Sequence, residues 1–168
     1  VDWMRQIYTS QIDWSAQIVE DATLEDLEPE AIMIARKGFK ERFPQFSADV
    51  DNWADSVFLD RANLTQDGMI TRTALLLVGK REKAHKLGHI AQIVWKCYQD
   101  KETFGDIFTI PFIKATTDVL GCIRNYRFKI YPHNSMIPAE VLKYDTRSIL
   151  EGMHNCILHQ DYVCNERI

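Results

Sequence analysis

The apolar positions between residues 29 and 62 recur at three- and four-residue steps, a spacing that predicts two amphipathic helices. The first lies between Pro29, which suits the first turn of a helix, and Pro44, which ends it. Its apolar stripe comprises Ile32, Ala35, Phe39 and Phe43. The second helix runs over about 50–62, with Asp49 or Asp51 as its cap. Its inner face comprises Trp53, Val57, Phe58 and Ala62.

A tight turn at Asp67-Gly68 follows, and Thr71 then caps a short, very apolar helix that Gly79 ends. This order of helix, turn and helix resembles a helix-turn-helix element, although the same order is common in helical folds of other functions. Residues 1–28 look irregular by comparison. Two stretches within them could each form a short strand, Ile7-Tyr8-Thr9 and Gln17-Ile18-Val19.

From about residue 90 the apolar period changes from helical spacing to alternation. The predicted elements are a hairpin over 91–110 with a polar turn at 100–103, a helix over 112–125 that Pro111 opens, a strand over 127–131, a loop over 133–139 that includes Asn134-Ser135, and a helix over 145–162 with Asp145 as its cap. The whole pattern predicts an α+β fold. In this fold a helical N-terminal half is followed by a β-hairpin or small sheet packed with two helices.

The composition, with 46% hydrophobic and 26% charged residues, is that of a soluble globular protein. The chain has no apolar run long enough to span a membrane and no signal peptide, so we expect a cytoplasmic protein without a membrane partner. The net charge of -4 argues against broad binding to nucleic acid. The densest basic patch is expected to be a solvated helix end; it comprises Arg72, Lys80, Arg81, Lys83 and Lys86.

The four cysteines form no CxxC pair, so reduced thiols are expected. A zinc site is an alternative for two of them, because Cys156 and Cys164 lie close in sequence to His154 and His159. Their spacing matches no common zinc pattern, and a cysteine is often simply a small buried residue.

The last predicted helix carries the strongest candidate chemistry. Glu151, Asn155 and His159 stand at i, i+4 and i+8, which places their side chains along one helix face. A carboxylate can take a proton, an amide oxygen can coordinate magnesium, and a histidine can hold a phosphate. The same spacing is equally typical of a solvated helix face. The side expected to face a core comprises Ile149, Leu150, Met153, Cys156 and Ile157.

The stretch from Glu151 to Tyr162, EGMHNCILHQDY, resembles the E-A-x-x-N-A-x-x-H-R-D-Y motif of a bacterial and archaeal family. Its members are described as transcriptional regulators or RecG-like ATP-dependent helicases, also called the divergent AAA family. Residues 64–80, LTQDGMITRTALLLVGK, are similar to the L…DG.LT.AALLLFGK segment of that family. Residues 15–32 resemble the link that follows its N-terminal Schlafen AlbA-type domain.

The resemblance implies a piece of a longer regulator, which also fits a chain that begins without Met. Residues 1–28 would be a linker-like segment after the AlbA-type nucleic-acid-binding domain, and 29–89 a helical region. Residues 90–168 would be an α+β region that ends in the first helix of a GHKL-like ATPase segment. DNA would then be bound through other domains of the full-length protein.

By the same resemblance, Glu151 would be the general base of the full-length protein and Asn155 its magnesium ligand in an ATP site. His159 and Asp161 match the motif and join the candidate catalytic residues. The chain departs from the motif where Gly152 and Cys156 replace the usual alanines and Gln160 replaces arginine. Gly152 weakens the helix by up to ~1 kcal/mol relative to alanine.

No GxxxxGK[ST] phosphate loop occurs, so we expect no cofactor in this chain and no ATP binding measurable by calorimetry. Two alternatives stay open: a DNA-binding module that uses residues 55–80, and a nucleotide hydrolase that uses Glu151, Asn155, His159 and Asp161. We also expect a homodimer through the last helix if cutting the chain there exposes apolar residues. Those residues are Ile149, Met153 and Leu158.

Overall fold

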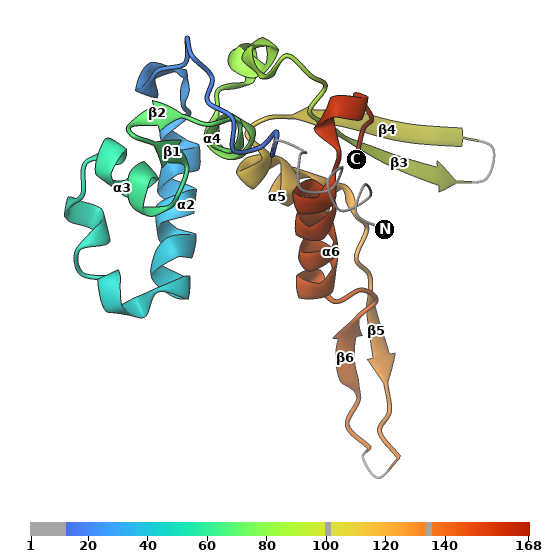
Figure 1. Ribbon diagram of the computed structural model, residues 1–168. Coiled ribbons are helices and arrows are strands. Elements are labelled where there is room, and N and C mark those ends of the chain that lie inside the picture. Colours follow the sequence, from blue (N-terminus) through green and yellow to red (C-terminus); the bar gives the residue numbers. More distant parts are fainter. Residues whose placement is uncertain (1–12, 100–101, 134–135) are drawn as a thin grey trace, which may run out of the picture.

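The computed structural model describes residues 13–99, 102–133 and 136–168, and it confirms the predicted α+β fold. Figure 1 shows α2 and α3 to one side of α4, and two hairpins that extend away from the helices. The helices are α2 (Pro29–Arg42), α3 (Asp55–Arg61), α4 (Arg72–Val78), α5 (Phe112–Cys122) and α6 (Thr146–His159). The antiparallel hairpins are β1 (Thr65–Gln66) with β2 (Met69–Ile70), β3 (Gln92–Gln99) with β4 (Glu102–Thr109), and β5 (Arg127–Ile130) with β6 (Ala139–Leu142). The 3₁₀ helices are η1 (Leu24–Asp26), η2 (Pro44–Phe46), η3 (Val50–Asn52), η4 (Arg81–Leu87) and η5 (Tyr162–Cys164).

The short helix α4 lies at the centre of the core, and α2 and α5 both pack against it. Four of its residues are buried, namely Ala74, Leu75, Leu76 and Val78. The hydroxyl oxygen of Thr71 caps the helix by accepting a hydrogen bond from the amide of Ala74, as predicted. At the other end, a Cβ atom on Gly79 would lie 2.4 Å from the carbonyl oxygen of Leu75, so only glycine fits there.

Residues 15–28, which we call the strap, run alongside both ends of α4. Near the N-terminal end, the amide of Val19 donates to the carbonyl of Ile70 at 2.9 Å, and Ile18 forms a β-bridge with Thr71. At the C-terminal end, the amide of Glu28 donates to the carbonyl of Val78 at 2.7 Å. The strap is thus paired with both ends of α4, whereas the assignment of residues 1–28 to a linker-like segment after another domain stays a prediction. The stretch 17–19 does pair as a strand would, whereas the candidate strand at 7–9 lies outside the described residues.

The turn at Asp67-Gly68 forms as predicted, with φ of 51° and 77° at its two residues. Two consecutive left-handed residues make a type I′ hairpin turn, which aligns Thr65 with Ile70 in the β1–β2 register. A β-hairpin rather than a simple turn thus separates α3 from α4. Because α4 is buried, it does not present the exposed recognition helix that a helix-turn-helix element needs.

The predicted helix over 50–62 is interrupted. Val50–Asn52 is a 3₁₀ turn, Trp53 is extended, and α3 begins only at Asp55, so neither Asp49 nor Asp51 caps it. The guanidinium of Arg36 on α2 donates to the carbonyls of Val50 and Trp53. These contacts use carbonyls that a continuous helix would need for its own hydrogen bonds.

Two side chains in this region are more exposed than the sequence predicts. Val57 is exposed although it was placed on the inner face of the second helix, and Phe43 is exposed at the end of the α2 stripe. Phe43 instead packs on Phe39, with ring centroids 4.7 Å apart. The buried residues of α3 are Phe58 and Leu59.

The C-terminal half contains the predicted hairpin, helix and final helix, with three differences. α5 ends at Cys122 and α6 ends at His159, each three residues earlier than predicted. The hairpin forms with a register that pairs Gln92 with Thr109. The expected loop over 133–139 is followed by a strand, β6, that the sequence did not reveal. Residues 100–101 of the predicted turn and Asn134-Ser135 lie outside the described residues. Among those described, no helix has the length and apolar character needed to cross a bilayer.

A buried carboxylate fixes the strap against η4. Asp26 is 3% exposed and forms ion pairs with Lys83 at 2.8 Å and Lys86 at 2.9 Å. The two ammonium groups, with the amide of Thr23, hold the pKa of Asp26 well below its usual range and outweigh the opposing effect of burial. Two lysines of the predicted basic patch are therefore paired with one buried carboxylate. Arg72, another member, donates to the side-chain oxygen of Gln17.

We predict that Asp26→Asn lowers the free energy of unfolding by about 2 kcal/mol at pH 7, because it leaves two lysines without their buried partner. The folded-state pKa is lowered, so this stabilisation is present above the ordinary aspartate pKa of 3.8 and is lost as the pH falls below it. Urea unfolding from pH 7 to pH 3 measures the difference. Asp51→Asn, which removes an exposed ion pair with Lys40, is the matched control and changes stability by less than about 0.5 kcal/mol. An equal loss in both variants would contradict the prediction.

Candidate functional site: the cleft beside the last helix

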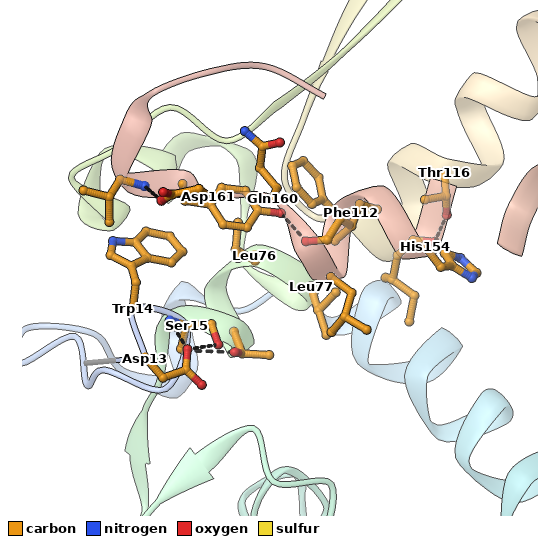
Figure 2. A pocket seen from close by; sticks show the side chains of 16 residues that line it. Asp13, Trp14, Ser15, Leu76, Leu77, Phe112, Thr116, His154, Gln160 and Asp161 are labelled. Atoms are coloured by element: carbon orange, nitrogen blue, oxygen red, sulfur yellow. Dashed lines mark hydrogen bonds between the residues drawn. The ribbon is translucent and has the colours of Figure 1, made fainter. Parts of the chain in front are cut away.

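A cleft of about 920 Å³ lies between α4, α5, the C-terminal end of α6 and residues 13–15 (Figure 2). This volume is within the range of small-molecule sites in proteins. Its apolar lining comprises Leu76, Leu77, Phe112, Ile113, Ile157 and Leu158. The lining comes from segments far apart in the sequence, which the packing of α5 on both α4 and α6 brings together.

One wall of the cleft is an aromatic pair, Trp14 and Tyr162. The two rings stack with centroids 5.0 Å apart, and the indole N–H of Trp14 donates to Nδ1 of His89 at 3.2 Å. The guanidinium of Arg72 lies 4.8 Å from the indole ring. The hydroxyl of Tyr162 donates to the carbonyl of Ile157 at 2.9 Å, which fixes η5 on the end of α6.

The acidic groups that line the cleft are Asp13 and Asp161. Asp13 accepts hydrogen bonds from the hydroxyl and the amide of Ser15, and the hydroxyl chiefly lowers its pKa. His154 also lines the cleft, and Figure 2 shows it at the other end of the view from Asp13 and Asp161. No lysine or arginine is among the described residues that line the cleft. The cleft therefore suits neutral or cationic groups better than a phosphate.

Asp161, a candidate catalytic residue, has a local structural role in this arrangement. Its carboxylate accepts from the amide of Val163 at 3.0 Å and so caps η5. It also accepts from the thiol of Cys164 at 3.3 Å. This hydrogen bond and the carboxylate charge raise the pKa of Cys164, which disfavours a reactive thiolate.

The other candidates, Glu151, Asn155 and His159, lie along one face of α6 as predicted, and all three are exposed. None of them is among the residues that line the cleft. Within the described part of the chain, none makes a side-chain hydrogen bond or ion pair. The structure thus separates the three from Asp161 instead of gathering all four around one cavity.

The opposite side of α6 covers the core only in part. Four of its apolar residues are half-buried, namely Ile149, Leu150, Met153 and Ile157. Cys156 is exposed, so its predicted place on the core face is wrong. The reason is that α6 packs mainly against α5, which covers only a narrow stripe of it. Leu158 is 74% exposed at the edge of the cleft.

The zinc alternative has no geometric support in the described residues. There, no three His, Cys, Asp or Glu side chains lie close enough together to hold a metal ion, so His154, Cys156, His159 and Cys164 do not form a ligand set. Cys122 is half-buried, and burial raises the pKa of its thiol.

Most of the cleft wall could not be predicted from the sequence. Trp14 stands in a stretch taken as irregular, and its partner Tyr162 is 148 positions away. A tryptophan in a polar stretch was the one available signal, because such a large apolar side chain usually packs on something. Nothing in the spacing indicated the partner.

The fold and cleft define an α+β protein whose helical unit, built around α4, joins a second unit that ends in α6. The chain belongs to a family described as a domain of unknown function (DUF8451), whose model matches residues 3–93, just over half of the chain. The match contains the whole helical unit and ends within β3; α5 and α6 lie beyond it. No curated protein and no solved structure matches the chain.

We predict that Tyr162→Phe lowers the free energy of unfolding by about 1 kcal/mol at pH 7, because the Ile157 carbonyl loses its donor. Burial raises the pKa of Tyr162 from 10.0 to about 12. The stabilisation from the protonated phenol is therefore present below pH 10 and lost as the pH rises from 10 to about 12. The wild type should lose stability across this window relative to Tyr162→Phe, as measured by chemical denaturation.

Tyr131→Phe is the matched control, because Tyr131 is 69% exposed and its hydroxyl remains in water. We expect it to match the wild type at every pH. A Tyr162→Phe variant that follows the wild type through alkaline pH would show that the phenol is not held protonated by burial.

Proposed function

We propose that this chain is a connecting module of a transcriptional regulator, placed between a nucleic-acid-binding domain and an ATPase-like domain. In this proposal it has no complete catalytic site of its own. The resemblance of residues 151–162 and 64–80 to the divergent AAA family supports the assignment. The DUF8451 match concerns the helical unit and gives no activity.

The main support for the proposal is the exposure of the polar face of α6. Glu151, Asn155 and His159 project from one exposed helix face, and no described residue engages their side chains. A general base, a magnesium ligand and a phosphate contact need further groups around the nucleotide. The face is therefore suited to be one wall of a nucleotide site that another segment or subunit completes.

The charge of the neighbouring cleft supports an incomplete site. A bound triphosphate needs positive groups or a cluster of backbone amides around its oxygens. The cleft offers instead the carboxylates of Asp13 and Asp161. A hydrolase that works within this chain would have to place phosphate next to these carboxylates, which Coulomb repulsion opposes.

The alternative of a DNA-binding module in residues 55–80 has less support. Its second helix, α4, is buried, and Lys83 and Lys86 beside it are paired with Asp26. Phosphate contacts need free lysines and arginines on an exposed surface. In our proposal, DNA contacts therefore belong to other domains of the full-length regulator.

We predict that ATP with magnesium binds this chain only weakly, with a dissociation constant on the order of 1 mM or more, because one wall supplies few contacts. Isothermal titration calorimetry should show no measurable heat at micromolar protein. In two-dimensional NMR at about 10 mM nucleotide, shifts should be confined to the polar face of α6. Asn155→Ala should remove them, whereas His154→Ala, which changes an exposed neighbour on the same helix, should retain them.

Two results would contradict the proposal. Micromolar affinity would mean that the chain holds a complete nucleotide site. Shifts that are absent from α6, or that remain unchanged in Asn155→Ala, would mean that this face is an ordinary solvated surface.

A further inference from the structure

The hairpin of β5 and β6 extends away from the rest of the molecule beyond the first turn of α6 (Figure 1). Its base is firmly held. The side-chain oxygen of Asn125 accepts from the amide of Tyr144 at 3.0 Å, and its side-chain amide donates to the carbonyl of Tyr144 at 2.9 Å. The amide of Lys143 donates to the carbonyl of Tyr126 at 2.8 Å, which continues the ladder below β5. The ribbon therefore leaves the body in a defined direction.

The register divides the ribbon into two different faces. Phe128 pairs with Val141, and Ile130 pairs with Ala139, so all four side chains share one face. Tyr126 continues this face at the base. The opposite face carries Arg127, Lys129, Glu140 and Leu142, with an ion pair of 3.6 Å between Arg127 and Glu140. We call the first set, Tyr126, Phe128, Ile130, Ala139 and Val141, the apolar ribbon face.

The apolar ribbon face is open to solvent. Phe128 is 49%, Ile130 48% and Val141 39% exposed, and Tyr126 at the base is 56% exposed. Alternation of apolar and polar residues is the pattern of a sheet with one covered face. A two-stranded hairpin alone is also marginally stable in water. Both facts call for a partner on this face.

We propose that the partner is a second copy of this chain, whose own ribbon stacks on the first through a two-fold axis. The apolar ribbon face is exposed in each copy. When two ribbons stack face to face, each one buries the apolar face of the other, and together they form a four-stranded sandwich. Arg127, Lys129 and Glu140 lie on the opposite face, away from such an interface. Lys143, which lies across from Tyr126, is at the edge of the interface near the base of the ribbon. This inference does not depend on the proposed function.

The exposed area of the apolar ribbon face limits the affinity of the dimer. The exposed parts of the apolar ribbon face amount to on the order of 500 Å² per copy, or about 1,000 Å² in a symmetric dimer. That is the lower bound for a specific interface. The dimer is therefore weak, with a dissociation constant on the order of 10 µM.

Two adjacent residues on opposite faces of β5 provide a matched test. Sedimentation equilibrium over about 5–500 µM protein should show a monomer–dimer equilibrium for the wild type. Ile130→Glu places a charge in the proposed interface and should weaken dimerisation at least tenfold. Lys129→Glu introduces the same residue one position earlier on the outer face and should change the dissociation constant less than about threefold.

Hydrogen exchange of the wild type gives a second measurement, which needs no variant. The β5 and β6 amides should exchange more slowly as the concentration rises through the dissociation constant, and those of α2 should not change. A chain that stays monomeric to 500 µM would overturn the proposal. A dimer that persists in Ile130→Glu would also overturn it. The same holds if Leu158→Glu, at the end of α6, abolishes the dimer while Ile130→Glu does not.

Discussion

The enclosure of α4 is the constraint on which the rest of the structure depends. This helix has seven residues, too few to be stable alone in water, and four of them are buried. Neighbouring elements must therefore bury its apolar side chains, and α2, α5 and the strap do so. The strap pairs with the chain just before α4 and just after it, so the helix is held at both ends as well as along its sides.

Holding the strap has consequences at both of its ends. At its C-terminal end, Asp26 is buried and forms ion pairs with Lys83 and Lys86, two lysines of the most basic stretch of the chain. At the N-terminal end, the amide of Thr73 donates to the carbonyl of Ser15 at 2.9 Å, which places Trp14 against Tyr162. The cleft thus exists because the segment that covers α4 also reaches the end of α6.

Local signals in the sequence predicted local structure well. Asp67-Gly68 takes the left-handed turn, Thr71 and Asp145 cap their helices through side-chain oxygens, and Pro29 begins α2. Each of these features depends on residues within four positions of one another.

Features that depend on distant partners were missed. The strap pairs with residues about 50 positions away, so neither its burial nor the cleft wall at Trp14 left a periodic pattern. The spacing of Glu151, Asn155 and His159 correctly predicted a shared helix face, but spacing alone could not show that Asp161 caps η5 instead of joining them.

Native-state hydrogen exchange tests most directly whether the strap is part of the core. The amides of Val19 and Glu28 donate to Ile70 and Val78, and the amide of Gly79 donates to Leu75 at the end of α4. If the strap encloses α4, all three should open together, with exchange free energies within about 1 kcal/mol of one another. Rapid exchange at Val19 and Glu28 while Gly79 stays protected would contradict it, because the strap would then be a linker that only rests on a helix stable without it.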